Sequence, residues 1–168
     1  DTTFNIIPII HQNPVASFSI KKDTACVSIP LVFTSAASGI NVWNWNFGNA
    51  TGSTAPPFNR TYSTAGTYNI SLTVTDINNC TSLPATDVLV INPSPIVNAG
   101  PDKIAYYGYP VTLDASVLPP SVYNYLWTPS AGLSATNILK PTALPAVNTT
   151  YILQAEDVNT HCKATDAV

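Results

Sequence analysis

Residues 67–76 read TYNISLTVTD, and this stretch decides the fold class. Every second residue in it is apolar: Tyr68, Ile70, Leu72 and Val74. A period of two places one set of side chains on each face of a β-strand. We therefore expect a strand with one face in a core and the other face in solvent.

Similar short stretches recur along the chain, separated by Gly, Pro, Asn and Ser. They occupy residues 15–20, 28–33, 42–47, 87–91, 111–115 and 150–155. No window of a dozen residues has its apolar positions at helical spacing, and the chain contains 15 prolines. Short strands at such intervals are typical of an all-β sandwich.

The composition excludes several classes of function. Hydrophobic residues make up 45% of the chain and charged residues only 9%, with a net charge of −3. Six scattered Lys and Arg residues cannot form the basic stripe that nucleic-acid binding requires. No apolar run approaches the roughly 18 residues of a membrane span. No phosphate loop, zinc spacing or catalytic motif is present, so we expect neither an enzyme nor a cofactor.

The chain also contains an internal repeat. Trp45 and Cys80 are 35 positions apart, and so are Trp127 and Cys162. Both members of the second pair follow those of the first by 82 positions. The stretch TYNISLTVTDINNC (67–80) also resembles TYILQAEDVNTHC (150–162). Fixed-period similarity of this kind predicts tandem copies of one structural unit.

Proline-rich steps predict the boundaries of these copies. We expect one sandwich over residues 14–92 and a second over residues 93–168, the second without its last strand. Residues 1–13 then belong to a preceding unit of a longer array. Alternatively, this segment completes the open sandwich of a neighbouring molecule and so builds filaments.

Aromatic residues indicate where the cores lie. The stretch NVWNWNFGNA (41–50) places Trp43, Trp45 and Phe47 on one face of a strand. Trp127 is predicted to be a core residue by its position in the repeat. The tyrosines of the two matching Thr-Tyr pairs, Tyr68 and Tyr151, are also predicted to be core residues. The predicted core residues are Trp43, Trp45, Phe47, Tyr68, Trp127 and Tyr151.

The motif W-x-W-N-F-G-N at residues 43–49, followed by TYSTAGTYNISLTVTD (61–76), resembles the polycystic kidney disease (PKD) domain. The second copy is similar to divergent PKD-like repeats of very large Bacteroidota surface proteins. The resemblance implies two tandem Ig-like sandwiches in an extracellular setting. It also implies a role as a spacer or adhesion module rather than as a catalyst.

The chain departs from the family pattern at three positions. Asn46 and Asn49 stand where the family has aspartates, and Arg60 stands where it has histidine. Neutral amides cannot supply the negative charge that calcium needs, so the first copy is not expected to bind metal. In the second copy Asp102, Glu156 and Asp157 are weak calcium candidates, and the alternative is that they are solvated loop acids.

Related repeats carry a cysteine pair, which implies a Cys26–Cys80 disulfide worth about 4 kcal/mol in the chain-entropy model. The second copy keeps Cys162 but has Tyr106 at the partner position. Cys162 is therefore expected to be a free thiol, left by a decayed disulfide or used between molecules. His161 cannot act as its base, because adjacent residues of a strand point to opposite faces.

Two signals concern sugars. The triplets that begin at Asp1 and Asp23 resemble the O-glycosylation sites of Bacteroidota, which would modify Thr2 and Thr24. Separately, aromatic side chains outside a core can stack on sugar rings. The candidates in the second copy are Tyr106, Tyr107, Tyr109, Tyr123 and Tyr125.

These observations predict a non-catalytic, extracellular tandem module of a large bacterial surface or secreted protein. Its partners would be neighbouring repeats or protomers, bound through sheet edges, with a surface glycan or protein as a further ligand. The alternative is a carbohydrate-binding accessory module of a secreted polysaccharide hydrolase. Strand complementation, if it occurs, would add head-to-tail assembly to the first of these roles.

Overall fold

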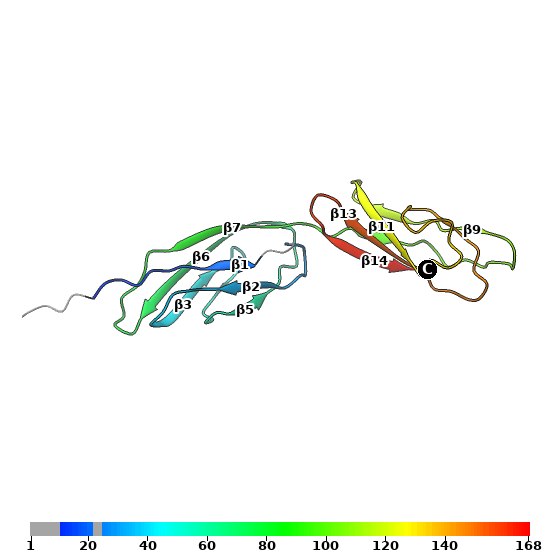
Figure 1. Ribbon diagram of the computed structural model, residues 1–168. Coiled ribbons are helices and arrows are strands. Elements are labelled where there is room, and N and C mark those ends of the chain that lie inside the picture. Colours follow the sequence, from blue (N-terminus) through cyan, green and yellow to red (C-terminus); the bar gives the residue numbers. More distant parts are fainter. Residues whose placement is uncertain (1–10, 22–24) are drawn as a thin grey trace, which may run out of the picture. The chain divides into compact units, whose positions relative to one another are not determined.

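The computed structural model describes residues 11–21 and 25–168, which form strands and loops and no helix (Figure 1). The prediction of an all-β chain is therefore confirmed. No helix capable of crossing a membrane is found in these residues. The chain divides into two compact units, Asp1–Ile91 and Asn92–Val168. Thr2, Thr24 and most of the expected N-terminal strand lie outside the described residues, and residues 11–13 form no strand.

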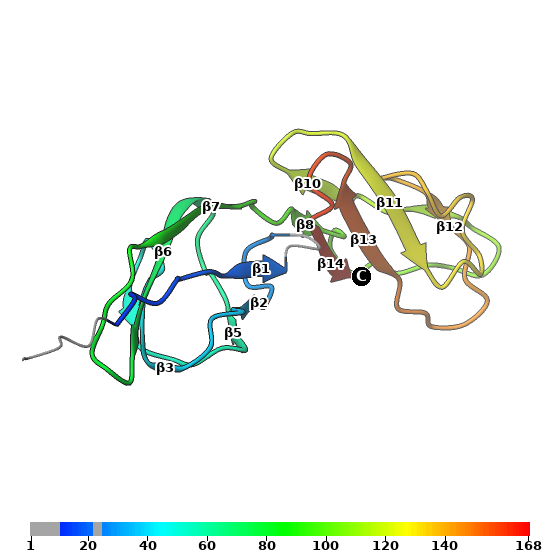
Figure 2. The same ribbon diagram turned by 60° about the vertical axis from the view of Figure 1, so that its left-hand side comes forward.

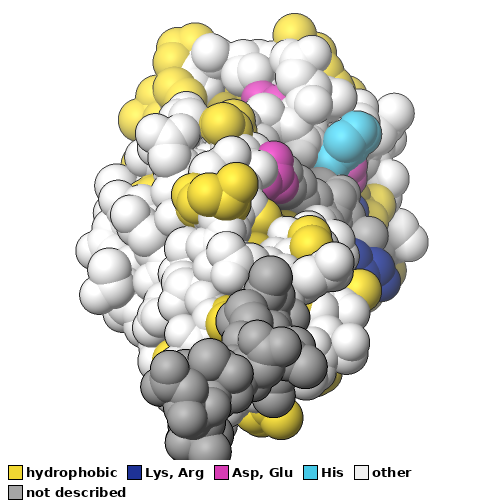
Figure 3. Space-filling view, turned by 90° about the vertical axis from the view of Figure 1, so that its left-hand side faces the viewer, with side chains coloured by type: hydrophobic (Ala, Val, Ile, Leu, Met, Phe, Trp, Pro, Cys, Tyr) yellow, Lys and Arg dark blue, Asp and Glu magenta, His cyan; other side chains and the backbone are white. Residues whose placement is uncertain are grey.

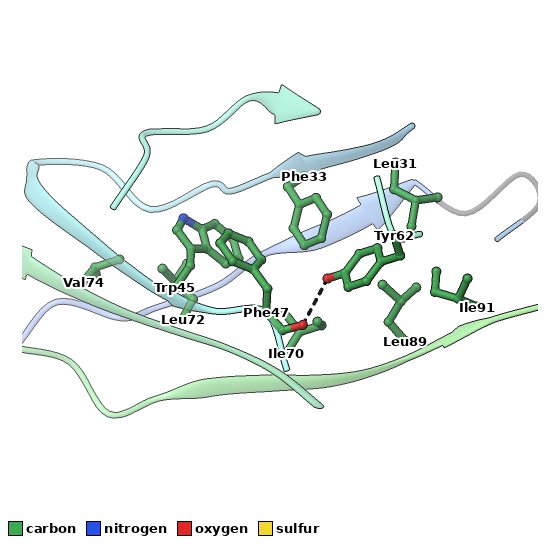
Figure 4. Close-up of a cluster of buried hydrophobic side chains, with 10 residues drawn as sticks. All are labelled: Leu31, Phe33, Trp45, Phe47, Tyr62, Ile70, Leu72, Val74, Leu89 and Ile91. Carbon is green, nitrogen blue, oxygen red and sulfur yellow. Dashed lines mark hydrogen bonds between the residues drawn. The ribbon is translucent and has the colours of Figure 1, made fainter. Parts of the chain in front are cut away.

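Unit 1 is a sandwich of two antiparallel sheets. The first sheet has the order β1 (Ser19–Lys21), β2 (Leu31–Thr34) and β5 (Phe58–Arg60). The second sheet has the order β4 (Thr51–Gly52), β3 (Ile40–Asn46), β6 (Gly66–Asp76) and β7 (Ala85–Ile91). Apolar side chains of both sheets meet between them (Figure 4).

Strand β6 contains the stretch that predicts the fold. Ile70, Leu72 and Val74 are buried, Tyr68 is half-buried, and the intervening polar side chains face outward. The strand is 11 residues long and pairs with β3 on one side and β7 on the other. Because the strand is long and its apolar and polar residues alternate throughout, the sequence pattern predicts this strand clearly.

Trp45 is the centre of the core of unit 1. Its ring lies 5.2–5.7 Å from four phenylalanine rings, most of them edge-on, which is the geometry that aromatic pairs favour. Its indole Nε1 donates a hydrogen bond to the Thr54 carbonyl at 3.0 Å. The four partners are Phe18, Phe33, Phe47 and Phe58. Trp43 is half-buried against the same cluster.

Unit 2 contains the remaining seven strands, seen from a second angle in Figure 2. A three-stranded sheet has the order β11 (Tyr123–Thr128), β13 (Ile152–Asp157) and β14 (Lys163–Ala167). Two strand pairs complete the unit: β8 (Ile96–Asn98) with β10 (Ser116–Leu118), and β9 (Val111–Thr112) with β12 (Thr142–Ala143). Trp127 and Tyr151 are buried in its core.

The two units place their central tryptophans in the same way. Trp45 is opposite Leu72 on the neighbouring strand, and Trp127 is opposite Leu153. As in unit 1, the indole Nε1 of Trp127 donates to a loop carbonyl, that of Ile138 at 3.0 Å. The positions that match in sequence therefore also match in strand pairing and in hydrogen bonding.

Unit 2 ends in strand β14 (Lys163–Ala167), at a place where the sequence interpretation expected no further strand. Strand β14 pairs with β13 from Ile152↔Ala167 to Glu156↔Lys163, whereas β7 pairs with the first part of β6, from Gly66↔Ile91 to Leu72↔Ala85. The sequence interpretation placed the recurring triplet ATD before the last strand. In the structure residues 85–87 open β7, and residues 164–166 lie inside β14.

Candidate functional site

The loop after β3, where the PKD hallmark has its carboxylates, is a closed turn. Asn46 Oδ1 accepts a hydrogen bond from the Gly48 amide at 2.9 Å, and the Phe47 amide donates to the Ala50 carbonyl at 2.8 Å. Gly48 has φ +79°, a conformation that side chains with a Cβ disfavour. The amide of Asn46 thus holds the turn, a role that an acceptor oxygen fulfils without negative charge.

Asn49 binds the residue that replaces the family's histidine. Arg60 Nη2 donates to Asn49 Oδ1 at 3.0 Å. The guanidinium group lies 4.0 Å from the centre of the Phe47 ring, an attractive cation–π arrangement. Two of the three departures from the hallmark, Asn49 and Arg60, therefore contact each other across the loop.

Asn49→Asp is expected to stabilise the protein by up to about 1 kcal/mol, because it converts this contact into an exposed ion pair. Urea unfolding at low ionic strength measures the change. Asn44→Asp is the matched control, since Asn44 is exposed on the same strand as Asn46 and faces Thr73. A gain that persists undiminished in 1 M salt would contradict the ion-pair explanation, because salt screens such pairs.

Tyr62 is a structural residue that the sequence interpretation missed. Its hydroxyl donates to the Phe47 carbonyl at 3.2 Å (Figure 4), and its ring lies 4.4 Å from that of Tyr68. Burial raises the pKa of Tyr62 above its ordinary value. The signal that would have found it is the T-Y that precedes the glycine at the start of β6. This contact links the hallmark loop to β6.

The weak calcium candidates of unit 2 do not meet. Asp102 borders a hollow next to Thr150 and Val168, and Val168 pairs with Tyr151. Glu156 lies five residues farther along the chain, about 16 Å away at strand spacing. Across the described residues no group of three His, Cys, Asp or Glu side chains could hold a metal ion. The calcium suggestion is therefore wrong.

Glu156 and Asp157 instead hold the turn after β13. Glu156 accepts hydrogen bonds from His161 Nδ1 at 2.9 Å and pairs with Lys163 Nζ at 3.0 Å. Asp157 Oδ1 accepts from the Asn159 and Thr160 amides at 2.9 and 3.0 Å. Asp76 caps the corresponding turn of unit 1 through the Asn78 and Cys80 amides.

Acid is expected to remove the contribution of Glu156 to stability. Hydrogen bonds from His161 and then Lys163 lower the pKa of Glu156 below its usual range. A folded-state pKa below the unfolded value means that the stabilisation is present above about pH 4.3 and is lost as the pH falls through the folded value. Melting temperatures of Glu156→Gln between pH 6 and pH 3 should fall less than those of the parent chain.

The matched control for this measurement is Asp102→Asn, which removes an exposed carboxylate at the opposite end of β13. We expect the melting temperature of Asp102→Asn to fall between pH 6 and pH 3 by nearly as much as that of the parent chain. An acid dependence that is identical in the parent and Glu156→Gln would show that the Glu156 contacts do not contribute.

The cysteines are arranged differently from the implied pairing. Cys80 is a free thiol, whereas Cys26 and Cys162 each take part in a disulfide. Cys26 lies in the turn whose Ser28 amide donates to Tyr62, which packs on Tyr68 near the start of β6. Cys80 follows the other end of β6, about 26 Å from Tyr68 at strand spacing. Two cysteines at opposite ends of a sheet cannot come within the roughly 7 Å that a disulfide needs.

Alkylation of the denatured chain without reductant should therefore label one cysteine of the three. Peptide mapping is expected to locate the label on Cys80, and reductant should expose all three. Cys80→Ser is the control and should abolish labelling without reductant. Label on Cys26 or Cys162 in that variant would contradict this assignment.

The five tyrosines suggested for sugar stacking fall into two groups. Tyr123 donates its hydroxyl to the Pro119 carbonyl at 2.7 Å, and Tyr125 packs against the core of unit 2. Tyr106, Tyr107 and Tyr109 are exposed in the loop before β9. The first group is half-buried and contributes to the fold, and the second group is exposed.

Comparisons with known proteins agree with this architecture. A family model described as PKD domain matches residues 11–91. The PKD1 domain of the Vibrio cholerae metalloprotease PrtV is 27% identical, with 48% of this chain and 99% of that chain covered and a TM-score of 0.40. The PKD1 domain of Vibrio anguillarum Epp is 30% identical, with 49% and 96% covered and a TM-score of 0.41.

A third solved structure, of carbohydrate-binding modules from the β-sandwich superfamily, is 18% identical to this chain. The matched region covers 86% of this chain and 55% of that chain, with a TM-score of 0.46. No curated protein matches the sequence.

Proposed function

Because residues 11–91 are a PKD domain, we propose that the chain is a non-catalytic extracellular module. Within a bacterial surface or secreted protein it acts as a structural spacer or adhesion element. The two units are two copies of one module, an assignment that their matching tryptophans and capped turns support.

The observation that best supports this proposal is the set of contacts made by the PKD hallmark residues in the loop after β3. Asn46 holds the turn, Asn49 holds Arg60, and Arg60 covers Phe47. At these positions a ligand-binding loop would present unpaired charge or open coordination. Here the side-chain oxygens of Asn46 and Asn49 both accept hydrogen bonds from within unit 1, so these two residues stabilise the loop.

The cysteines and the surface favour an extracellular setting. Disulfides persist in oxidising compartments and are rare in the cytosol, and Cys26 takes part in one. The view in Figure 3 shows a mostly uncharged surface with few acidic and basic side chains, in keeping with the 9% of charged residues. Such a surface suits a module that avoids nonspecific ionic contacts.

Adhesion would use the sheet edges. Strands β7 and β14 are the last members of their sheets among the described strands. In such a role a strand of a neighbouring repeat or protomer would add to a sheet edge. Val88 and Val90 on the outer face of β7 are exposed, which favours such contacts.

Stretching the full chain between two handles under reductant tests the spacer role. A spacer must resist force as folded units, so we expect two separate unfolding steps. The step for residues 11–91 should release at most about 290 Å of extended chain. Smooth extension without steps, as for an unstructured linker, would contradict the proposal.

A further inference from the structure

The outer face of the four-stranded sheet of unit 1 carries two adjoining hollows. One lies over β4, β3 and β6 and has a volume of about 490 Å³. The other lies over β3, β6 and β7 and has a volume of about 620 Å³. Both volumes fall within the range of small-ligand sites, about 300–1,000 Å³. Asn46 and Ser71 line both hollows, so the two share a border at the middle of the sheet.

A row of hydrogen-bonding side chains crosses all four strands at this border. The strand register places Asn46 opposite Thr51 on one side and opposite Ser71 on the other. Ser71 in turn is opposite Thr86 on β7. Directly paired residues share a face of the sheet, and the row spans three strand spacings, about 14 Å. The row is therefore long enough to meet several groups of an extended ligand.

The lining of the two hollows is polar and almost uncharged. Among the described lining residues, each amide and hydroxyl side chain is both a hydrogen-bond donor and an acceptor. Asp87, on the edge strand β7, is the one charged residue of this lining. The amide and hydroxyl side chains are those of Asn44, Asn46, Thr51, Ser53, Asn69, Ser71, Thr73 and Thr86.

The hydroxyls of this face are not used by the fold. Elsewhere in unit 1 hydroxyls on paired residues bond to each other, as those of Thr75 and Thr81 do at 3.1 Å. Ser71 and Thr86 are also directly paired, yet their hydroxyls have no hydrogen-bond partner among the residues that the structure describes. Their donors and acceptors are therefore available to a ligand.

The shared plan of the two units does not require these polar residues. The pair that follows the central tryptophan is Asn46↔Ser71 in unit 1 and Thr128↔Ile152 in unit 2. Unit 2 thus has an apolar residue where unit 1 has Ser71. The hydrogen-bonding row is a property of unit 1 alone.

We propose that the two hollows bind a neutral oligosaccharide. A sugar hydroxyl is both donor and acceptor, so it can satisfy an amide or a hydroxyl side chain in either sense. An anionic ligand would only accept hydrogen bonds, and it would meet Asp87 without a cation in the described lining. Charge complementarity therefore favours an uncharged ligand. The proposal supplies a ligand for the adhesion role proposed above and rests on that role.

The test titrates the full ¹⁵N-labelled chain with neutral hexasaccharides: β-1,4-linked glucose, xylose and mannose, and α-1,4-linked glucose. For at least one of them we expect chemical-shift changes confined to residues 44–53, 69–73 and 86–88, which line the hollows. Ser71→Ile, which introduces the residue of unit 2, removes the central hydroxyl and fills the shared border. It should raise Kd about tenfold or more, equivalent to about 1.4 kcal/mol.

Ser71→Ala removes the hydroxyl without adding bulk and should raise Kd about two- to tenfold, as expected for one lost hydrogen bond. Thr67→Val is the matched control, since Thr67 is exposed on the same strand and lines neither hollow. It should leave Kd unchanged. Unchanged affinity in both Ser71 variants would contradict the proposed site.

Absence of shifts at millimolar concentrations of all four sugars would overturn the proposal. So would tighter binding of a hexagalacturonate, which is anionic. Shifts at the same residues that depend on protein concentration without sugar would identify a second copy as the occupant and would also overturn it. The stretching measurement does not report on this face, so the spacer role and the sugar site fail separately.

Discussion

Replacement of Trp45 by alanine is expected to destabilise unit 1 by about 3–5 kcal/mol, the range for deleting a large buried aromatic side chain. Trp45 is almost fully buried and contacts four phenylalanine rings. Its removal leaves a cavity that these rings cannot fill, and it also leaves the Thr54 carbonyl without its donor. This is the largest effect that we expect from one substitution in unit 1.

Urea unfolding followed by backbone NMR measures this loss in each unit separately. Because the core of unit 2 is a distinct cluster around Trp127, its resonances should keep their midpoint in Trp45→Ala. Trp43→Ala is the control: Trp43 lies on the same strand and is only half-buried, so the loss should be clearly smaller. Equal losses for the two variants would contradict the assignment of Trp45 as the core centre.

Gly132→Ala is expected to destabilise unit 2 by about 2–4 kcal/mol, because backbone strain and overpacking add. Gly132 has φ +77°, and an added Cβ would lie 2.7 Å from the Leu144 carbonyl oxygen. The Leu144 amide donates to the Gly132 carbonyl at 2.7 Å, so the two backbones cannot separate without losing this bond.

Gly108→Ala isolates the part of this loss that comes from φ alone. Gly108 has φ +83°, but no atom lies within 4 Å of the added Cβ. We expect a loss of about 1 kcal/mol, the cost of a left-handed conformation for alanine. Thermal unfolding of the two variants gives the comparison. A loss for Gly132→Ala no larger than for Gly108→Ala would mean that the close approach to Leu144 relaxes without cost.

The long strands and the cores could be predicted from the sequence. In β6 the alternation persists over 11 residues, and in β3 the two tryptophans share a parity with Phe47. Strands of two or three residues, such as β4, β9 and β12, are too short to show any period. The triplet ATD at residues 164–166 lies inside β14, where the sequence interpretation expected no strand.

Features that depend on distance in space were harder to predict. The pairing of Cys26 with Cys80 followed from the resemblance, and sequence separation does not tell which end of a sheet a cysteine occupies. The same holds for Asp102 and Glu156, which the chain brings to opposite ends of β13. The capping role of Asp76 and Asp157 was predictable, because it depends on neighbours within a few residues.

Hydrogen exchange at the three indole Nε1–H groups tests most directly whether both units share one construction. The Nε1–H groups of Trp45 and Trp127 donate to the Thr54 and Ile138 carbonyls, each at 3.0 Å. We expect both indole protons to exchange slowly and that of the half-buried Trp43 to exchange fast. Slow exchange at Trp45 together with fast exchange at Trp127 would contradict the account of two units built on the same plan.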